Sequence, residues 1–456
     1  MKHTTYQLDM ASGALASKIL LFALPLMLSS VLQLLFNAAD VVVVGRFCGK
    51  ASLAAVGSTT SLINLIINLF VGLSVGANVV VAQDLGAGQR EEANRTVHSC
   101  ITLSVLSGIF LTCVGTLFAP KLLQWMDSPA SVIDLSALYV RVYFLGMPAT
   151  MVYNFGSAVL RAQGDTQRPL YFLTFSGIVN VILNVFFIVI CHWDVAGVAA
   201  ATIIAQYISA GLVLRCLRQE SGPLHLEWRK LELRWSVMRR ILRVGLPAGF
   251  QGIVFSLSNV VIQSTINSFG DVVMAGSAAA QNIESFIYAA MSSFYQTSLT
   301  FAGQNYGAGQ YRRVDKVAAY CVGMALTTGL ILGFTVYCFG RPLLEIYSPD
   351  DPLVVEAGFL RLSMIVRLYC LGGYMEAMVG ALRGIGYSVM PLIVSVLGCC
   401  VFRITWVFAV FPLNPTPEML YTSYPITWIL TGTTHLLVFL LVRKRAYRKR
   451  QAQLSQ

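Results

Sequence analysis

Three acidic residues stand apart from the other charges because each interrupts a long uncharged stretch: Asp40, Glu284 and Glu376. An ionised carboxylate is unstable in apolar surroundings unless it takes up a proton, meets an opposite charge or binds a cation. At the centre of a bilayer each one costs about 2.5–3.5 kcal/mol on insertion scales. The sequence therefore indicates reversible binding of a proton or a small cation at some of these positions.

Asp40 has an amide on the same face of its expected helix, because Asn37 precedes it by three residues. A carboxylate in such a place can take up a proton, since the loss of water favours its neutral form. It can equally bind sodium, together with amide and hydroxyl oxygens. The structural alternative is a neutral or paired acid near the outer end of the helix. We expect Asp40 to bind a proton or a small cation, and it is the one position at which a sodium ion is expected.

Glu284 belongs to a second polar pattern. Gln281 precedes it by three residues and Tyr288 follows it by four, so the expected helix carries a polar and aromatic stripe within an apolar span. Such a stripe predicts the wall of a cavity rather than a surface in contact with lipid.

Glu376 is the third acid, with Met375 beside it and Tyr369 seven residues before it. Methionine and aromatic side chains repack around varied apolar ligands, so these residues are a second candidate cavity wall. For both glutamates the alternative is contact between helices through salt bridges to Arg367 or Arg403, which themselves need partners in a membrane.

The elements that position these residues are apolar helices. Of the 456 residues, 56% are hydrophobic and 12% are charged, against roughly 45–50% and 25% in soluble domains. Uncharged runs long enough to cross a bilayer recur along the chain, which indicates a protein that spans the membrane many times. The net charge of +11 does not favour nucleic-acid binding, because the basic residues lie between and after the apolar runs.

Charges, glycines and prolines divide the chain into twelve expected helices. They start near residues 15, 52, 97, 132, 169, 195, 239, 273, 315, 353, 390 and 420. With both termini in the cytoplasm, 24 of the 32 lysines and arginines fall in cytoplasmic segments. The positive-inside rule therefore predicts that both ends of the chain lie in the cytoplasm.

The two halves of the chain repeat one another. Residues Gln83–Gln89 recur 221 residues later as Gln304–Gln310, with five identities in seven. At an offset of 222, Leu24-Pro25 recurs as Leu246-Pro247 and Leu160-Arg161 as Leu382-Arg383. Six spans per half give both halves the same orientation. The predicted fold class is an all-α integral membrane protein, with twelve transmembrane helices in two parallel six-helix bundles related by a pseudo-twofold axis along the membrane normal.

The repeat also predicts the domains. An N-terminal lobe is expected over residues 1–217, a cytoplasmic connection over 218–238, and a C-terminal lobe with a basic cytoplasmic tail over 239–456. The connection mixes Trp228 and Trp235 with arginines and a lysine. It is either an amphipathic stretch at the level of the lipid headgroups or a solvated linker that only tethers the lobes.

Taken in order, these features resemble the MATE family, the multidrug and toxic compound extrusion transporters, and most closely its bacterial DinF-like branch. The resemblance covers nearly the whole chain. It rests on Leu24-Pro25 with Asn37 and Asp40, on the two Gln-x-x-Gly-Ala-Gly turns, and on the two Leu-Arg turns. It implies a twelve-helix exporter of the bacterial inner membrane that exchanges organic cations or amphiphiles for protons or sodium ions.

The resemblance also implies roles for single residues. In DinF-like relatives an aspartate at the position of Asp40 responds to protons or sodium, and it is joined by polar positions that match Asn180, Asn184 and Thr202. Asn180 and Asn184 are four residues apart on one helix face, as are Thr202 and Gln206, and both spacings agree with one pocket. Gln206 is also a candidate residue of the substrate cavity. Position 184 is often aspartate in those relatives and is asparagine here, which removes one carboxylate.

Pro25 lies within the first expected helix, where it removes a backbone hydrogen bond and permits a kink. In DinF-like relatives, bending at a matching proline is proposed to respond to protonation. The resemblance therefore implies a bend in this helix, and a kink that serves only packing is the alternative.

The predicted function is a secondary active antiporter that exports organic cations or amphiphilic drugs by alternating access of two lobes. The alternative is a flippase for lipids or lipid-linked precursors. Such proteins often line their cavity with arginines, and the four arginines within expected helices keep this alternative open: Arg141, Arg361, Arg367 and Arg403.

An enzyme is not expected, because the sequence offers no catalytic cluster, and it has no P-loop for ATP-driven transport. No cofactor is expected beyond the driving ion, and the scattered histidines argue against a metal centre. The expected partners are a small-molecule substrate and membrane lipid, with no nucleic acid, and the chain is expected to be a monomer.

Overall fold

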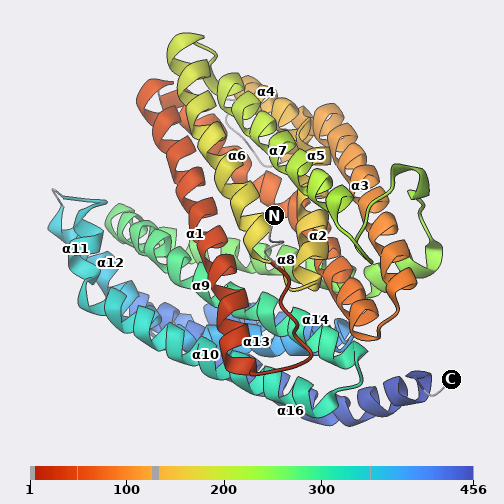
Figure 1. Ribbon diagram of the computed structural model, residues 1–456. Coiled ribbons are helices and arrows are strands. Elements are labelled where there is room, and N and C mark those ends of the chain that lie inside the picture. The colour runs from red at the N-terminus through yellow and green to blue at the C-terminus, as the bar shows by residue number, and fades with distance from the viewer. Residues whose placement is uncertain (1–5, 49, 126–132, 350, 455–456) are drawn as a thin grey trace. The chain divides into compact units, whose positions relative to one another are not determined.

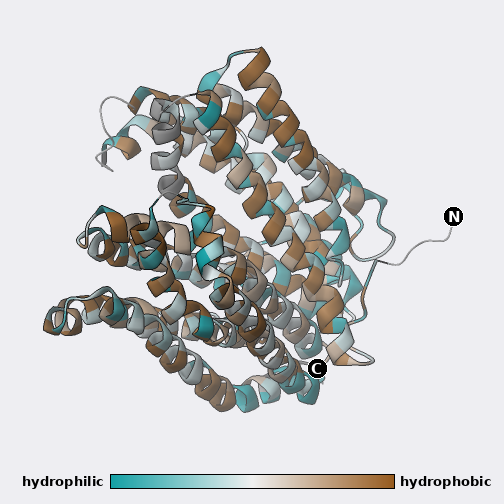
Figure 2. Cartoon of the chain, turned by 90° about the vertical axis from the view of Figure 1, so that its left-hand side faces the viewer, coloured by the Kyte–Doolittle hydropathy of each residue, from teal (hydrophilic) through white to brown (hydrophobic). Residues whose placement is uncertain are grey.

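The computed structural model describes residues 6–48, 50–125, 133–349 and 351–454. In this part of the chain every regular element is helical and no β-strand occurs (Figure 1). Figure 2 shows hydrophobic residues along the helices and hydrophilic residues concentrated at the connections. Many large apolar side chains are exposed, among them Leu21, Leu117 and Ile190. This distribution is that of helices surrounded by lipid.

Twelve helical segments follow one another in the described part of the chain. They are α1 (Leu15–Phe47), α2 (Lys50–Gly86), α3 (Arg90–Trp125), α4 (Ile133–Phe144) with α5 (Met147–Ala162), α6 (Gln167–Val185) with the π-helix η1 (Phe186–Ile190), α7 (Asp194–Gln219), α8 (Trp235–Asn267), α9 (Asp271–Gly307), α10 (Tyr311–Cys338), α12 (Pro352–Ile365) with η3 (Val366–Leu368) and α13 (Cys370–Gly384), α14 (Val389–Ser395) with η4 (Val396–Val401), α15 (Phe402–Thr405), η5 (Trp406–Val410) and η6 (Phe411–Leu413), and α16 (Pro417–Leu454). The short helices η2 (Trp228–Lys230) and α11 (Gly340–Glu345) lie between them.

The twelve segments begin close to the predicted starts, and the all-α fold class is confirmed. Among the described residues, nine helices are long and apolar enough to cross a membrane, and α4 with α5, bent by 47°, forms a tenth. The other two segments are α9 and α12 with α13. These are the segments that hold Glu284 and Glu376.

The repeated motifs end helices in the same way in both halves. After α2, Gly88 has a φ of 70°, and after α9, Gly309 has a φ of 72°. The backbone N–H of Gln89 donates to the backbone carbonyl oxygen of Asp84, and that of Gln310 donates to the backbone carbonyl oxygen of Asn305. A glycine is needed where φ is positive, so the Gly-Ala-Gly turns are C-caps of helices.

The contacts divide the chain into two compact units. Unit 1 contains Met1–Asp9 and Leu28–Gly249, and unit 2 contains Met10–Met27 and Phe250–Gln456. The first part of α1 therefore belongs to unit 2, and the first part of α8 belongs to unit 1. The changes of unit fall at residues 27 and 249, which are 222 residues apart. The lobes expected at 1–217 and 239–456 stay a prediction.

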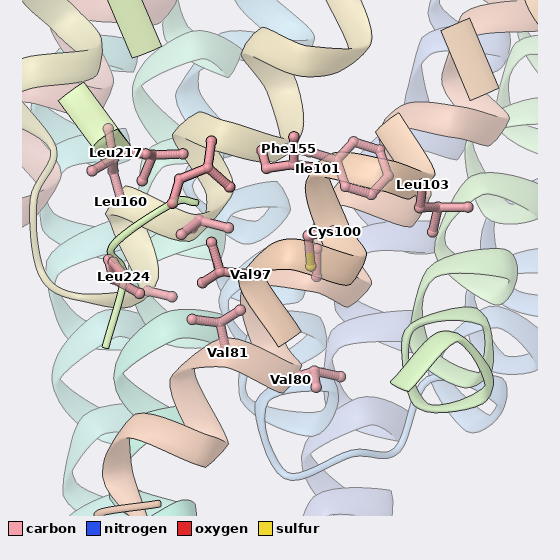
Figure 3. Close-up of a cluster of buried hydrophobic side chains, with 14 of the residues drawn as sticks. Val80, Val81, Val97, Cys100, Ile101, Leu103, Phe155, Leu160, Leu217 and Leu224 are labelled. Carbon is pink, nitrogen blue, oxygen red and sulfur yellow. The ribbon is translucent and has the colours of Figure 1, made fainter. Parts of the chain in front are cut away.

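Within unit 1, α2 and the first part of α8 approach backbone to backbone. A Cβ on Gly72 would lie 2.3 Å from the Gly249 nitrogen, and one on Gly76 would lie 2.3 Å from the Ile241 carbonyl oxygen. Gly72 and Gly76 on α2, like Gly245 and Gly249 on α8, are four residues apart, the spacing that lets membrane helices pack closely. A core of buried side chains surrounds this contact, including Val80, Val97 and Phe155 (Figure 3).

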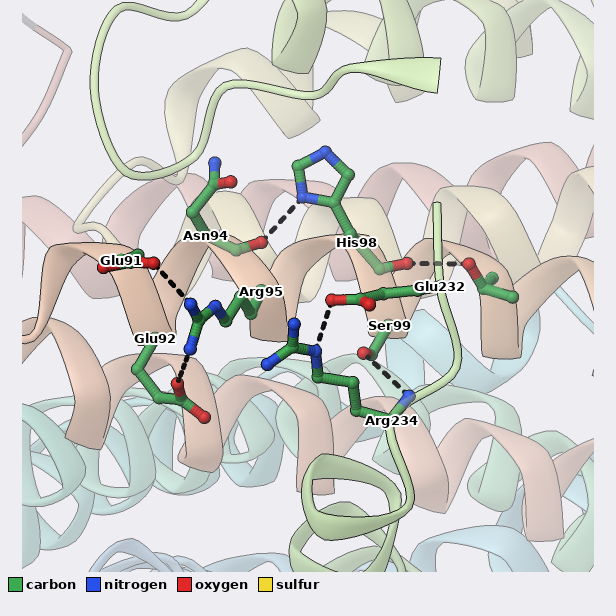
Figure 4. A network of polar contacts seen from close by, with 9 residues as sticks. Glu91, Glu92, Asn94, Arg95, His98, Ser99, Glu232 and Arg234 are labelled. Carbon is green, nitrogen blue, oxygen red and sulfur yellow. Dashed lines mark hydrogen bonds and ion pairs between the residues drawn. The ribbon is translucent and has the colours of Figure 1, made fainter. Parts of the chain in front are cut away.

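The connection between the halves is part of unit 1 and packs into its core. Leu224 and Leu226 are buried in its core, and the backbone N–H of Glu227 donates to His98 Nε2 over 3.0 Å. Figure 4 shows further polar contacts at this end of α3, where the Arg234 N–H donates to Ser99 Oγ. A hydrogen bond from Lys230 lowers the pKa of the exposed Glu227 carboxyl. The connection is thus a docked segment and not a linker that only tethers.

Unit 2 is built around α9 and α13, where glycines again permit close packing. A Cβ on Gly380 would lie 2.5 Å from the Tyr295 carbonyl oxygen. Residues before α1 are held at the start of α10, because Arg313 donates to the carbonyl oxygens of Ser12 and Gly13. Phe22 of α1 packs edge-to-face on Phe301 of α9, which completes the core of this unit.

The close glycine contact predicts the effect of adding bulk. Gly76→Leu should lower the stability of the purified protein in detergent by about 1–3 kcal/mol or more, because the backbones of α2 and α8 must separate. Gly211→Leu on α7 is the matched control, since a Cβ there meets nothing within 4 Å. Denaturant unfolding checks the pair, and equal stability of the two variants would contradict the contact.

Candidate functional site

A chain of hydrogen bonds in unit 1 ends at Asp40. Asn184 of α6 donates through Nδ2 to Asp40 Oδ1 of α1 and, over 3.4 Å, to Asn180 Oδ1. Asn180 in turn donates to Thr202 Oγ1 of α7 over 3.4 Å, and Thr202 donates to the Val198 carbonyl oxygen. The structure therefore brings Asp40, Asn180, Asn184 and Thr202 together, and Asn184 donates to the carboxylate while Asn180 and Thr202 donate away from it.

Local packing holds α1 against α6 at this point. A Cβ on Gly177 would lie 2.0 Å from the Phe36 ring, so only glycine lets the ring enter. One turn later on α1 stands Asp40, and two turns later on α6 stands Asn184. The π-helix η1 begins directly after α6, and such wide turns often occur at functional sites.

The site offers oxygen atoms to a small cation or a proton. Asp40 is partly buried and Asn184 is 1% exposed. Among the described residues, Asn184 Oδ1 is buried and accepts no hydrogen bond, and an unsatisfied buried oxygen is costly. A cation beside Asp40 would bind Asn184 Oδ1 together with a carboxylate oxygen of Asp40. The polar groups of this cluster are a carboxylate, two amides and a hydroxyl, and oxygen donors of this kind suit a hard cation such as sodium, or a proton.

The other predicted residues of the first half of the chain are Asn37, Gln206 and Pro25. Asn37 is exposed and makes no hydrogen bond to another described residue. Gln206 lies beside Gly146, where a Cβ would come within 2.4 Å of its Oε1. Pro25 lies inside α1, which runs as one helix from Leu15 to Phe47. Whether the helix bends there in response to protonation stays a prediction.

In unit 2, Glu284 forms a buried ion pair with Arg361 of α12. Arg361 Nε and a terminal nitrogen donate to the two carboxylate oxygens over 2.8 and 2.9 Å. The other terminal nitrogen donates to Ser277 Oγ over 2.9 Å. The guanidinium also lies 5.5 Å from the centre of the Tyr421 ring. Arg361 is 2% exposed and Glu284 is 5% exposed, so both charges are neutralised within the unit.

The partners suggested for Glu284 from the sequence, Arg367 and Arg403, were wrong. Arg367 donates to the Ser363 carbonyl oxygen, and Arg403 donates to Thr427 Oγ1 and lies 4.2 Å from the Tyr424 ring centre. Arg361, which the sequence had marked only for the flippase alternative, faces α9 instead. This geometry is that of the helix contact considered as the alternative for Glu284.

The remaining predicted cavity residues fall in two environments. Gln281 and Tyr288 of α9 are exposed, while Tyr369 and Glu376 are partly buried. Glu376 makes no ion pair with another described residue. Met375 is 4% exposed, and its sulfur accepts from Cys399 over 3.5 Å. Consecutive helical residues point about 100° apart, so Met375 and Glu376 lie on different faces of α13. Met375 is thus part of the core of unit 2.

Sequence reasoning missed a polar network at the end of α2. Both terminal nitrogens of Arg240 donate to Asp84, and Thr96 Oγ1 donates to Asp84 Oδ2 over 2.9 Å. Asp84 is 1% exposed. It belongs to the repeated Gly-Ala-Gly motif, so the repeat marked the position, but its partner is 156 residues away.

Comparison with known proteins confirms the repeat. A family model described as MatE matches residues 25–186 and then, at an offset of 222, residues 247–408. The chain belongs to the MatE family. The matches cover most of both halves, and they place this MatE chain among membrane transporters rather than enzymes.

Curated relatives are similar over most of their length. The probable multidrug resistance protein YoeA of Bacillus subtilis is 27% identical over 383 residues, which cover 82% of each chain. The FAD transporter of Shewanella oneidensis is 22% identical over 354 residues, covering 76% of this chain and 77% of that protein. Both are bacterial, in agreement with a multi-pass protein of a bacterial membrane.

Solved structures share the fold. A crystal structure of MATE in complex with MaL6 has a TM-score of 0.90 at 21% identity, covering 98% of this chain and 100% of that one. An outward-facing multidrug resistance MATE family transporter of the MOP superfamily has a TM-score of 0.88 at 20% identity, covering 99% and 100%. At these identities the likeness shows the fold of the MatE chain.

The buried pair in unit 2 predicts a large effect on stability. Glu284→Gln should destabilise the protein by about 3–5 kcal/mol, because it leaves the Arg361 charge buried without a counter-charge. The double variant E284L/R361M should recover much of this loss. Glu356→Gln is the control, since Glu356 pairs with Arg341 at the surface, where such pairs contribute about 0–1 kcal/mol.

Denaturant unfolding in detergent measures all of these variants. A Glu284→Gln variant as stable as the Glu356→Gln control would show that the ion pair does not hold α9 and α12 together.

Proposed function

We propose that this chain is a secondary active antiporter that exports organic cations or amphiphilic drugs in exchange for protons or sodium ions. The hydrogen-bonded chain that ends at Asp40 carries the proposal. It is supported by membership of the MatE family and by relatives named as probable multidrug resistance proteins. Two lobes that give alternating access, and a cytoplasmic location of both termini, are parts of the same proposal.

In the proposed cycle, Asp40 binds the driving ion. An ionised Asp40 already accepts one hydrogen bond from Asn184, and its second oxygen and Asn184 Oδ1 remain available for sodium. Proton binding would instead neutralise the carboxylate. Asn180 and Thr202 orient the Asn184 amide, and Asn37 at the exposed edge of α1 is proposed to line the entrance. No cofactor beyond the driving ion takes part in the proposed cycle.

The proposed substrate contacts in unit 2 are the predicted residues that are not fully buried: Gln281, Tyr288, Tyr369 and Glu376. Gln206 of unit 1 stays a predicted cavity residue. Glu376 is the acid of this set that no arginine holds within ion-pair distance among the described residues. A cationic group on the substrate would supply its missing counter-charge. Aromatic rings beside it would contact the apolar part of an amphiphile and attract its cation.

The test is transport by the purified chain in liposomes that carry an imposed proton or sodium gradient and a cationic dye. Wild type should move the dye when one of the two gradients is applied. Asp40→Asn should lose at least tenfold of this gradient-driven rate, because an amide neither takes up a proton nor carries charge for a cation. Glu91→Gln is the control, since Glu91 is an exposed acid of unit 1 paired with Arg95.

The proton and sodium arms of the assay identify the driving ion. Full coupling in Asp40→Asn, or wild type that moves no dye under either gradient, would contradict the proposal.

A second candidate is a flippase for lipids or lipid-linked precursors. Arg403 favours it, because this guanidinium is 4% exposed and has no carboxylate within ion-pair distance in the described part of the chain. An anionic headgroup could supply the missing charge. Competition in the same liposomes separates the candidates: inhibition of dye movement by phosphate-bearing lipids, but not by other cations, would favour the flippase.

A further inference from the structure

An open hollow of about 570 Å³ lies on unit 1 along the first three turns of α8. We refer to it as the α8 hollow. Its lining residues are Ser236, Arg239, Arg240, Leu242, Arg243 and Leu246. Three of the six are arginines, one is a serine and two are leucines, so the hollow combines positive charge with an apolar surface.

Two of these arginines have no counter-charge. Arg240 is bound to Asp84 through both terminal nitrogens. Arg239 and Arg243 are exposed, and neither makes a hydrogen bond or ion pair with another described residue. They stand four residues apart on one helix face, where like charges repel. An anion between the two guanidinium groups would relieve this repulsion and accept hydrogen bonds from both.

The apolar part of the hollow begins between the charges and extends past them, since Leu242 lies between Arg239 and Arg243 and Leu246 follows Arg243. Along α8, Leu242 and Leu246 follow Arg239, and from Arg239 to Leu246 the helix rises about 10 Å. The hollow thus changes from polar to apolar in the direction in which α8 enters its apolar stretch. A phospholipid has the same order, with a charged headgroup followed by its acyl chains.

Aromatic residues place this end of α8 at the level of lipid headgroups. Trp235, the first residue of α8, is 67% exposed, and Trp228 of the preceding connection is 48% exposed. Exposed tryptophans beside basic residues are typical of the boundary between membrane and water. The hollow therefore lies where a headgroup would meet it.

We propose that the α8 hollow binds a phospholipid with a net negative headgroup. Its phosphate lies between Arg239 and Arg243, and an acyl chain covers Leu242 and Leu246. A free phosphate ion would leave the two leucines in contact with water, and a zwitterionic headgroup would bring its ammonium close to the arginines. The site is separate from the Asp40 cluster, and its occupation does not depend on the proposed antiport.

Native mass spectrometry of the full chain in detergent tests this proposal. The protein is titrated with phosphatidylglycerol, with phosphatidylcholine of the same acyl chains, and with inorganic phosphate. Wild type should retain phosphatidylglycerol at least tenfold more tightly than phosphatidylcholine. The variant R239Q/R243Q should lose on the order of tenfold in affinity for phosphatidylglycerol and little for phosphatidylcholine.

The matched control is R312Q/K316Q. These two basic residues are also exposed, four apart and at the start of a helix, α10, without partners among the described residues. The control should keep wild-type affinity. The proposal is overturned if R239Q/R243Q binds phosphatidylglycerol as tightly as wild type, if both double variants lose affinity equally, or if inorganic phosphate displaces the lipid.

Discussion

Polar groups inside a bundle of apolar helices have almost no water to bind, so each must be satisfied by another part of the protein or by something that the protein carries. The two units meet this requirement in different ways. In unit 2 the buried charge of Glu284 is neutralised within the unit, because Arg361 donates to both of its carboxylate oxygens and also to Ser277 Oγ. Unit 1 leaves Asp40 with one amide donor and Asn184 with an unsatisfied oxygen. Only the arrangement in unit 1 leaves oxygen atoms that can bind a proton or a cation reversibly.

The two halves share their backbone turns and differ in the side chains at the site. At the offset of 222 residues that relates the two matches of the family model, the cluster of unit 1 corresponds to apolar and aromatic residues in unit 2. Asp40 corresponds to Ile262, Asn184 to Trp406 and Thr202 to Tyr424. The helix-ending glycines, by contrast, are present in both halves with nearly equal φ angles. The two halves thus share the turns that define the fold and differ in the residues that define the site.

Much of the fold followed from the sequence because its causes are local. Long uncharged runs predict spans, and glycine at a helix end predicts a turn wherever it occurs. The partner of Glu284 had no such signal, since Arg361 is 77 residues away and several other arginines lie within apolar runs. Asn37 shows the limit of spacing arguments: three residues from Asp40, it is about 60° away around the helix, and it is exposed while Asp40 is partly buried. The contact of Asp40 with Asn184 was expected only through family resemblance.

The division of α1 and α8 between the units has a consequence for how such a chain can be built. Unit 2 includes Met10–Met27 from the first repeat, and unit 1 includes the start of α8 from the second. A chain with a single repeat would lack the segment that completes its core. It could obtain that segment only from another copy, as a domain-swapped dimer does, and its folding would then depend on concentration. Joining the two repeats in one polypeptide makes the reciprocal donation intramolecular and removes that dependence.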